Sequence, residues 1–206
     1  GFMDIVPYTG TGTAMTVTHG LTVAPEMLFI KSRAFANWLW FYTGGSGMTF
    51  AIPLDGGTNN GVDASYTILT SAPTATEFAI STLTWINSST VDYIAFLFAS
   101  VDGVSKVGSY SGNGSTQNID CGFSGGARFI LIKHCGTGRP MFIWNSERGI
   151  VAGNDPSISL ISTAAEVTTN DYIDPHSAGF TVNVGDGSNS TDINKSGKTY
   201  VFLAIA

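Results

Sequence analysis

The side chains best suited to binding a partner are aromatic. Trp38, Trp40 and Tyr42 alternate with Leu39 and Phe41. On an extended strand, alternate side chains point to opposite faces, so the first three share one face and the other two share the second. Aromatic faces of this kind pack against protein or stack on a sugar ring. We expect one face to lie in a core, and the other either to meet a neighbouring domain or chain or to form a glycan platform.

A glycan platform also needs polar groups beside its aromatic rings. Trp85 could add a fourth ring, and the Asn- and Asp-containing loops could supply hydrogen bonds to sugar hydroxyl groups. The candidate glycan-binding residues are Trp38, Trp40, Tyr42, Trp85, Asn59, Asn60, Asp63, Asn145 and Asp186.

Carboxylates offer a different chemistry, the cleavage of polysaccharides. Asp155, Asp171 and Asp174 form the densest acidic group of the chain. Glycoside hydrolysis uses two carboxylates about 5–9.5 Å apart on either side of a sugar bond. A depolymerase is therefore one alternative, and carboxylates that are solvated or cap turns are the other.

Metal sites are weakly indicated. Cys121, His134 and Cys135 could be combined into a zinc site, but neighbouring residues on a strand point to opposite faces. Two oxygen-rich loops, Asp55 to Asp63 and Asp186 to Asp192, are somewhat similar to calcium loops, yet they lack the terminal glutamate and the flanking helices of an EF-hand. We expect no metal and no cofactor, and we expect the two cysteines to be free thiols rather than a disulfide.

Sequence motifs of common catalytic sites are absent. The chain has no nucleophile elbow, phosphate loop, zinc-binding His-Glu-x-x-His or dinucleotide fingerprint. Gly10-x-Gly12 and Gly112-x-Gly114 precede strands and lack a third glycine, so they indicate turns with positive φ. We therefore predict no catalytic residue and no enzyme activity.

The elements that position these residues are predicted to be strands. Short β-branched or aromatic runs are separated by turns rich in Gly, Ser, Thr and Asn, and the chain holds 25 glycines. This pattern predicts an all-β fold of antiparallel sheets, jelly-roll-like sandwiches. The expected strands cover residues 14–18, 27–31, 38–42, 78–83, 92–99, 117–121, 129–133, 140–144, 180–184 and 199–205. The stretch Ser162 to Thr169 is the one expected short helix.

The chain also matches itself at a shift of about 102 residues. The segment from Tyr8 to Thr13 aligns with Tyr110 to Ser115, and Met27 to Lys31 aligns with Phe129 to Lys133. Further aligned segments are 38–41 with 141–144, 86–87 with 193–194, and 93–99 with 200–206. We therefore predict two tandem, internally repeated antiparallel β-sandwich domains, 1–103 and 104–206.

The charges divide unevenly between these halves. The first has two basic and seven acidic residues, a net charge of −5, and the second has seven basic and eight acidic residues, a net charge of −1. We infer that one copy could carry a site while the other is structural.

The overall composition excludes several classes of protein. Of 206 residues, 43% are hydrophobic and 12% are charged, which allows a buried core and argues against disorder. No apolar run approaches the roughly 20 residues of a membrane span, so we expect no membrane insertion. A net charge of −6 disfavours nucleic acid as a partner.

Several motifs carry a family resemblance. They are Phe2-x-x-Ile5-Val6-x-Tyr8-Thr9-Gly10-x-Gly12-Thr13, Tyr110 to Ser115, Phe142 to Gly149, and Tyr200. Over nearly the whole chain, the pattern resembles a doubled β domain of large virion proteins from tailed phages, especially marine, cyanophage-like ones, of the tail-fibre or tail-spike-like kind. Because the shared motifs are turn and core residues, no catalytic residue is carried over.

The resemblance implies a location in the virion. It implies a non-enzymatic module of a tail fibre or receptor-binding protein that attaches to a host surface glycan. The expected partners are other virion proteins and copies of the same chain, with a trimer favoured. The alternatives are a capsid decoration or tail adaptor with only protein partners, and a polysaccharide depolymerase.

Overall fold

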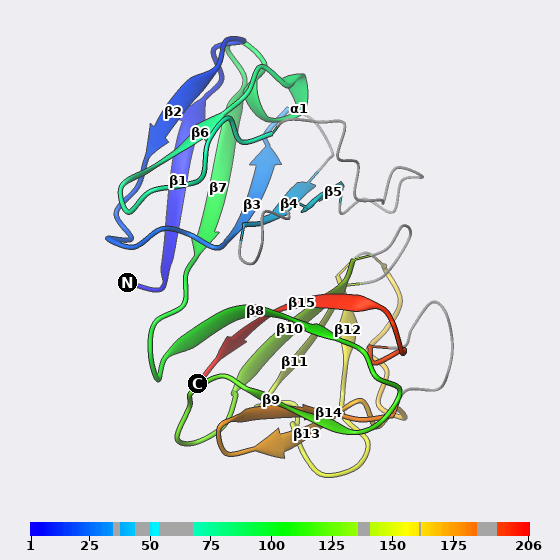
Figure 1. The fold of residues 1–206 in the computed structure, drawn as a ribbon. Helices are drawn as coiled ribbons and strands as arrows, with labels where there is room; N and C mark the ends of the chain where they lie inside the picture. The colour runs from blue at the N-terminus through cyan, green and yellow to red at the C-terminus, as the bar shows by residue number, and fades with distance from the viewer. Residues whose placement is uncertain (35–37, 44–49, 54–67, 136–140, 161, 185–192) are drawn as a thin grey trace. The chain divides into compact units, whose positions relative to one another are not determined.

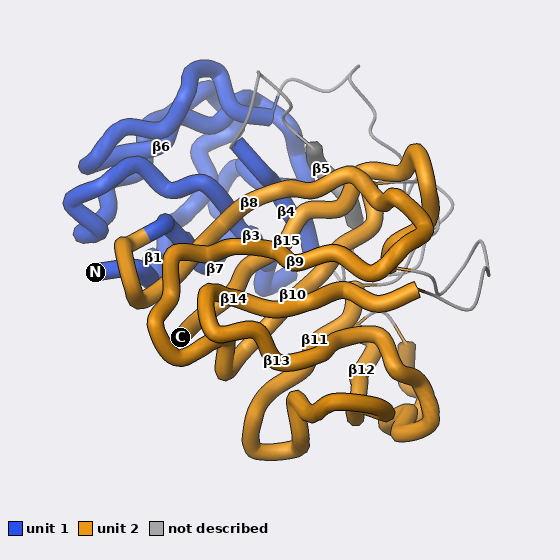
Figure 2. Tube along the Cα trace, turned by 60° about the horizontal axis from the view of Figure 1, so that its bottom comes forward, with its two compact units in different colours: residues 1–100 blue, residues 101–206 orange. Residues whose placement is uncertain are grey.

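The predicted all-β class is confirmed. The structure is a computed structural model that describes residues 1–34, 38–43, 50–53, 68–135, 141–160, 162–184 and 193–206. Among those residues the only helix is the four-residue α1, Thr84–Asn87. The chain divides into two compact units, Gly1–Ser100 and Val101–Ala206, coloured separately in Figure 2. The domain boundary expected after Gly103 lies close to this division.

The first unit is a sandwich of two antiparallel layers (Figure 1). A five-stranded sheet has the order β1-β7-β3-β4-β5, and β2 pairs with β6 in the second layer. The core lies between the layers, with Phe78 and Ile80 from β6 facing Leu28 and Phe41. The strand bounds are β1 Met3–Thr9, β2 Met15–Thr18, β3 Met27–Ser32, β4 Trp38–Tyr42, β5 Phe50–Pro53, β6 Glu77–Ile80 and β7 Asp92–Phe98.

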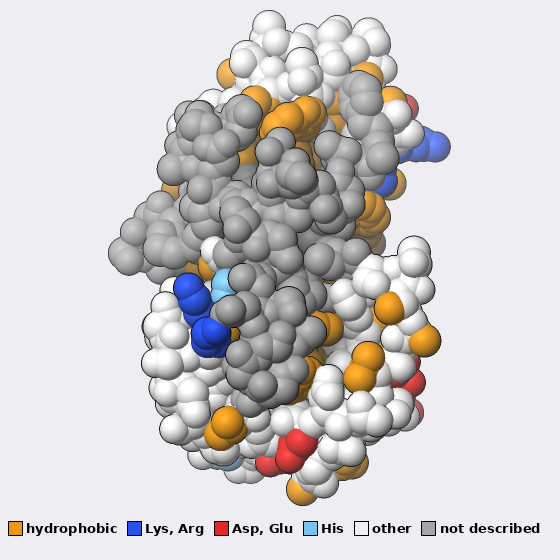
Figure 3. Space-filling model, turned by 90° about the vertical axis from the view of Figure 1, so that its right-hand side faces the viewer, with side chains coloured by type: hydrophobic (Ala, Val, Ile, Leu, Met, Phe, Trp, Pro, Cys, Tyr) orange, Lys and Arg blue, Asp and Glu red, His pale blue; other side chains and the backbone are white. Residues whose placement is uncertain are grey.

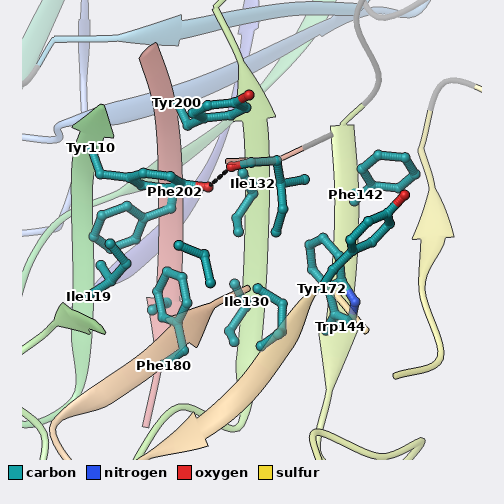
Figure 4. Packing of buried hydrophobic residues seen from close by; sticks show 14 of the residues in the cluster. Tyr110, Ile119, Ile130, Ile132, Phe142, Trp144, Tyr172, Phe180, Tyr200 and Phe202 are labelled. Carbon is teal, nitrogen blue, oxygen red and sulfur yellow. Dashed lines mark hydrogen bonds between the residues drawn. The ribbon is translucent and has the colours of Figure 1, made fainter. Parts of the chain in front are cut away.

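The second unit also has two antiparallel layers. Its five-stranded sheet has the order β12-β11-β10-β15-β8, and a three-stranded sheet has the order β13-β14-β9. Figure 4 shows the core between them, where Phe180 from β14 meets Phe202 from β15 edge to face at 5.3 Å. The strand bounds are β8 Ser105–Ser111, β9 Gln117–Asp120, β10 Phe129–His134, β11 Met141–Asn145, β12 Ile158–Ser159, β13 Ile173–His176, β14 Gly179–Val182 and β15 Thr199–Ile205.

A pair of stacked tyrosines recurs in both units. Tyr8 stacks on Tyr93 at 5.1 Å, and its hydroxyl donates to the Ile86 carbonyl at 2.7 Å. Tyr110 stacks on Tyr200 at 5.1 Å, and its hydroxyl donates to the Ile193 carbonyl at 2.6 Å, the dashed line in Figure 4. The residues aligned by the self-similarity therefore make matching contacts.

Each unit has a buried asparagine whose side chain binds two backbone carbonyls. The Asn87 side chain donates to the carbonyls of Thr13 (2.6 Å) and Ser81 (2.8 Å). Its counterpart Asn194 donates to the carbonyls of Ser115 (2.7 Å) and Asn183 (3.1 Å). Both asparagines are fully buried, and such bonds offset the cost of placing an amide in a core.

The turns beside these asparagines need glycine for two reasons. Gly12 and Gly114 have φ of 76° and 72°, which confirms the positive φ predicted for these turns. Gly10 and Gly112 instead have no room for a Cβ, because it would collide with the carbonyls of Ser88 and Lys195.

The predicted helix from Ser162 to Thr169 is wrong. The described residues of this stretch are exposed and not helical, and Val167 forms an antiparallel bridge with Ser157. Its Thr and Val side chains favour extended backbone, and the segment lacks the apolar stripe that would fix a helix on a core. The helix α1 instead forms where Ile86 is buried.

The surface carries little charge. On the face shown in Figure 3, few of the described side chains are charged, and hydrophobic side chains lie scattered over it. Within the described part of the chain, no helix has the length and apolar character needed to cross a membrane.

Candidate functional site

Strand β4 alternates as predicted, but most of its aromatic side chains are buried. Leu39 and Phe41 belong to the core of the first unit. On the opposite face, Trp40 is 0% exposed and Tyr42 is 5% exposed, so neither ring is accessible to a sugar in this structure. Trp38 keeps partial exposure and stacks on Phe96 at 5.9 Å.

The other predicted glycan-binding residues do not join Trp38. Trp85 lies in α1 and packs against the core cluster, whereas Trp38 lies on the opposite face of the sheet. Asn145 ends β11 and fastens a turn, since its Oδ1 accepts a hydrogen bond from the Arg148 backbone at 3.0 Å. Asn59, Asn60, Asp63 and Asp186 lie outside the described residues, as do the two oxygen-rich loops.

Asp155 is a fully buried carboxylate that ties the loop after β11 to β13. Its Oδ1 accepts from the Val151 amide at 3.1 Å, and its Oδ2 accepts from the Ile173 amide at 3.0 Å. Its pKa is raised to about 6, chiefly by burial, with a further increase from nearby Asp171 and Asp174 and an opposing decrease from the two amides. Asp155 therefore binds the backbone of two segments and is not exposed to solvent.

Asp171 and Asp174 lie near Asp155, as their density in the sequence suggested, and Asn183 joins them. The Asn183 side chain donates to Asp171 Oδ1 at 2.6 Å and to Asp174 Oδ2 at 3.0 Å. The Gly153 amide donates to Asp174 Oδ1 at 3.1 Å. These hydrogen bonds hold the loop after β11 against β13. The acidic group therefore fixes the position of the backbone in these two segments.

The loop and strand held by these carboxylates form two walls of a pocket in the second unit. The pocket has a volume of about 340 Å³, at the small end of the range for ligand pockets. It is lined by Gly125, Gly126, Ala127, Arg128, Ser146, Ile150, Pro175, His176 and Ser177. Ile150 precedes the Val151 amide that Asp155 binds, and Pro175 and His176 end the strand that begins with Ile173.

Hydrogen-bond donors predominate among the polar side chains of the pocket. Arg128 contributes a guanidinium whose ionic contact, within the described residues, is with Glu147 at 3.4 Å, between side chains that are 69% and 84% exposed. His176 Nδ1 is buried without a hydrogen-bond partner among the described residues, which favours the tautomer with the proton on Nε2. Ser146 and Ser177 add hydroxyl groups, and no carboxylate of the described chain lines the pocket.

Glycine is required at one wall of this pocket. Gly126 has φ of 81°, and a Cβ there would lie 2.9 Å from the His176 carbonyl oxygen. The absence of a side chain therefore lets the segment before β10 approach β13 closely.

A second hollow lies in the first unit, with a volume of about 270 Å³ between β1, β7 and the residue after β3. Two of its polar groups are already paired, because the Thr9 hydroxyl donates to Asp92 Oδ1 at 2.8 Å. Its lining also includes the apolar Pro7 and Ile94.

Neither thiol is arranged for chemistry. Cys121 and Cys135 are free, and burial is the main reason that the pKa of each is raised to about 12. Across the described residues, no group of three or more His, Cys, Asp or Glu could hold a metal ion.

Comparison with known proteins places the whole chain in one family. The family described as Domain of unknown function (DUF7483) matches residues 1–206. The chain belongs to the DUF7483 family. No curated protein and no solved structure gives a significant match.

The pocket of this DUF7483 domain was not among the sequence-based candidates. Its residues come from separate segments of the chain, and none of them forms a recognisable motif. The signal in the sequence was the self-similarity, in which basic Arg128 aligns with acidic Glu26 inside otherwise similar segments.

Proposed function

We propose that this DUF7483 domain is a non-enzymatic virion module of a tailed phage, part of a tail fibre or receptor-binding protein, that attaches to a host surface glycan. The observation that carries the glycan part is the pocket of the second unit, where the Arg128 guanidinium makes, among the described residues, one long and exposed contact with Glu147 and keeps hydrogen-bond donors for a ligand. Sugars present many acceptor oxygens to such donors. The virion part rests on the resemblance of the turn and core motifs.

An apolar sheet face supports a role in an assembly. On edge strand β1, Ile5 is 52% exposed and Met3 is 39% exposed. Neighbouring β7 adds the half-buried Ile94, Phe96 and Phe98 on the same face. Exposed apolar strands at a sheet edge are a liability in an isolated chain and are commonly covered by a partner. We therefore propose other virion proteins and further copies of the chain as partners, with a trimer favoured.

The same apolar face favours a second candidate function. If only protein partners cover the module, it is a capsid decoration or tail adaptor and the pocket has no glycan. A depolymerase is less well supported, because Asp155 is buried and the carboxylates of Asp171 and Asp174 are engaged by Asn183. A hydrolase needs carboxylates that contact the sugar.

The 206-residue chain can be tested on an array of bacterial surface glycans, with release of reducing ends as a second readout. We expect retention of at least one glycan class without release of reducing ends. Ordered incorporation into particles with no retention on the array would favour the adaptor. Release of reducing ends would contradict a non-enzymatic role.

The assembly part is tested separately by light scattering. We expect Ile5→Lys to shift the mass of the chain toward the monomer while the fold is kept. The matched control is Val184→Lys, which adds the same charge at an exposed valine outside this sheet face. Equal masses for the wild type and Ile5→Lys would argue against β1 as an assembly surface.

A further inference from the structure

We infer that the pocket of the second unit binds the carboxylate-bearing residue of an acidic glycan, and that the matching place in the first unit does not. This inference rests on the proposed function and names its substrate class and its location.

The two places have the same backbone framework. The Arg128 amide donates to the Ile205 carbonyl at 2.7 Å, as the Glu26 amide donates to the Phe98 carbonyl at 2.8 Å. The carbonyls of Arg128 and Glu26 in turn accept from Ser146 and Thr43, both at 2.8 Å. Arg128 therefore stands where the first unit has Glu26.

The charged side chains at these matching positions differ in sign and in how they are satisfied. Glu26 accepts a hydrogen bond from the Ser100 amide at 2.7 Å, so its carboxylate is bound within its own unit. Arg128 has the long, exposed contact with Glu147, a kind of pair that contributes little to stability. A ligand carboxylate can replace Glu147 at little cost.

The histidine is also specific to the second unit. The Cys121 amide donates to the Ala178 carbonyl, and the His19 amide donates to the Thr76 carbonyl, both at 2.8 Å. Thr76 is therefore equivalent to Ala178, and Thr74, two residues earlier, is equivalent to His176. Thr74 Oγ1 caps its own turn by accepting from the Glu77 amide at 3.1 Å. The first unit therefore has a capped turn at this position, whereas in the second unit His176 lines the pocket.

The donors of the pocket fit a carboxylate on a sugar ring. A guanidinium binds a carboxylate with two parallel hydrogen bonds, and such charge-assisted bonds are stronger than neutral ones. His176 and the hydroxyls of Ser146 and Ser177 can bind ring hydroxyl groups, while Ile150 and Pro175 offer apolar surface to a ring face. A volume of about 340 Å³ suits a small ligand group such as one sugar residue.

The test measures binding of two sets of oligosaccharides to the whole 206-residue chain by calorimetry. One set ends in glucuronic acid or N-acetylneuraminic acid, and the other ends in glucose or galactose. We expect the acidic set to bind and Arg128→Glu, which installs the acidic residue of the first unit, to weaken binding by about tenfold or more. His176→Thr, which installs the residue type of Thr74, should weaken it too.

The matched control is Lys198→Glu, which makes the same charge change at an exposed residue outside the pocket and should leave binding unchanged. Equal weakening by Lys198→Glu would show a long-range charge effect and overturn the inference. Because the Arg128 side chain is largely exposed, Arg128→Glu should fold, and His176→Thr gives a second route if it does not.

Three outcomes separate this inference from the proposed function. Binding of the neutral set alone, unaffected by Arg128→Glu, would overturn the acidic-sugar assignment while leaving glycan attachment in place. Inorganic phosphate that displaces a bound glycan more effectively than glucuronic acid would assign the pocket to phosphate and overturn the inference. No binding to any glycan, here and on the array, would overturn both.

Discussion

At the scale of single residues, polar side chains mostly stabilise the framework. Asp155, Asn87 and Asn194 are fully buried, and each binds backbone groups of segments far apart in the sequence. Such groups are costly to leave unpaired, so their positions fix the backbone around them. Arg128 is different, because its side chain is exposed and makes a long contact with Glu147, which is also exposed.

Asp155 gives the second unit a pH dependence. The folded chain keeps the Asp155 proton up to a pH of about 6, the value to which burial raises its pKa, whereas an unfolded aspartate loses it near its ordinary pKa. Between these values the folded state binds more protons, so this residue's contribution to stability falls as the pH rises.

We therefore expect Asp155→Asn to change the pH profile of stability. From pH 4 to pH 7 the free energy of unfolding of the wild type should fall relative to that of the variant, by an amount on the order of 2 kcal/mol. Urea unfolding at each pH measures this difference. Asp102→Asn, at an exposed position, serves as the control. A constant difference between the wild type and Asp155→Asn would contradict a raised pKa.

At the scale of elements, one side chain joins the ends of several strands. Asn194 connects the turn after β8 to the residue after β14 through the carbonyls of Ser115 and Asn183. Its Oδ1 also accepts from the Gln117 side chain on β9 at 2.7 Å. The two layers of the second unit are thus linked at one corner by hydrogen bonds as well as by the core.

Removal of this link should destabilise the second unit strongly. Asn194→Ala leaves several buried groups without partners, and we expect a loss of about 3 kcal/mol or more in the free energy of unfolding. Asn154→Ala, at an exposed asparagine, should change it by less than about 0.5 kcal/mol. Denaturant melts compare the two variants, and similar losses would argue against the link.

At the scale of the molecule, each unit has its own hydrophobic core. Phe78 belongs to the core of the first unit and Phe180 to that of the second, and both are almost fully buried. The five-stranded sheets share one strand order, with β8 in the place of β1 and β15 in the place of β7. The two units therefore share a sheet order but differ in side chains outside the strands, such as Glu26 and Arg128.

Separate cores predict separate responses to core substitutions. Phe78→Ala should cost about 3–5 kcal/mol within the first unit, and Phe180→Ala should cost a similar amount within the second. Hydrogen exchange followed by mass spectrometry should show faster exchange in residues 1–100 for the first variant and in 101–206 for the second. Faster exchange throughout the chain in both variants would indicate one cooperative unit instead.

The sequence by itself determined the all-β class, the alternation of β4 and the glycine turns. These features are local, since side-chain period and backbone φ depend on neighbouring residues. The matching of Tyr8 with Tyr110 could likewise be read from the chain, because similar segments place similar residues.

Only the tertiary structure decided which polar and aromatic groups are available to a ligand. Trp40 is buried and Asp155 binds two amides, while Arg128, Ser146 and His176 meet at one pocket from distant segments. Burial and proximity depend on what packs across a sheet and between strands, and no local pattern encodes them.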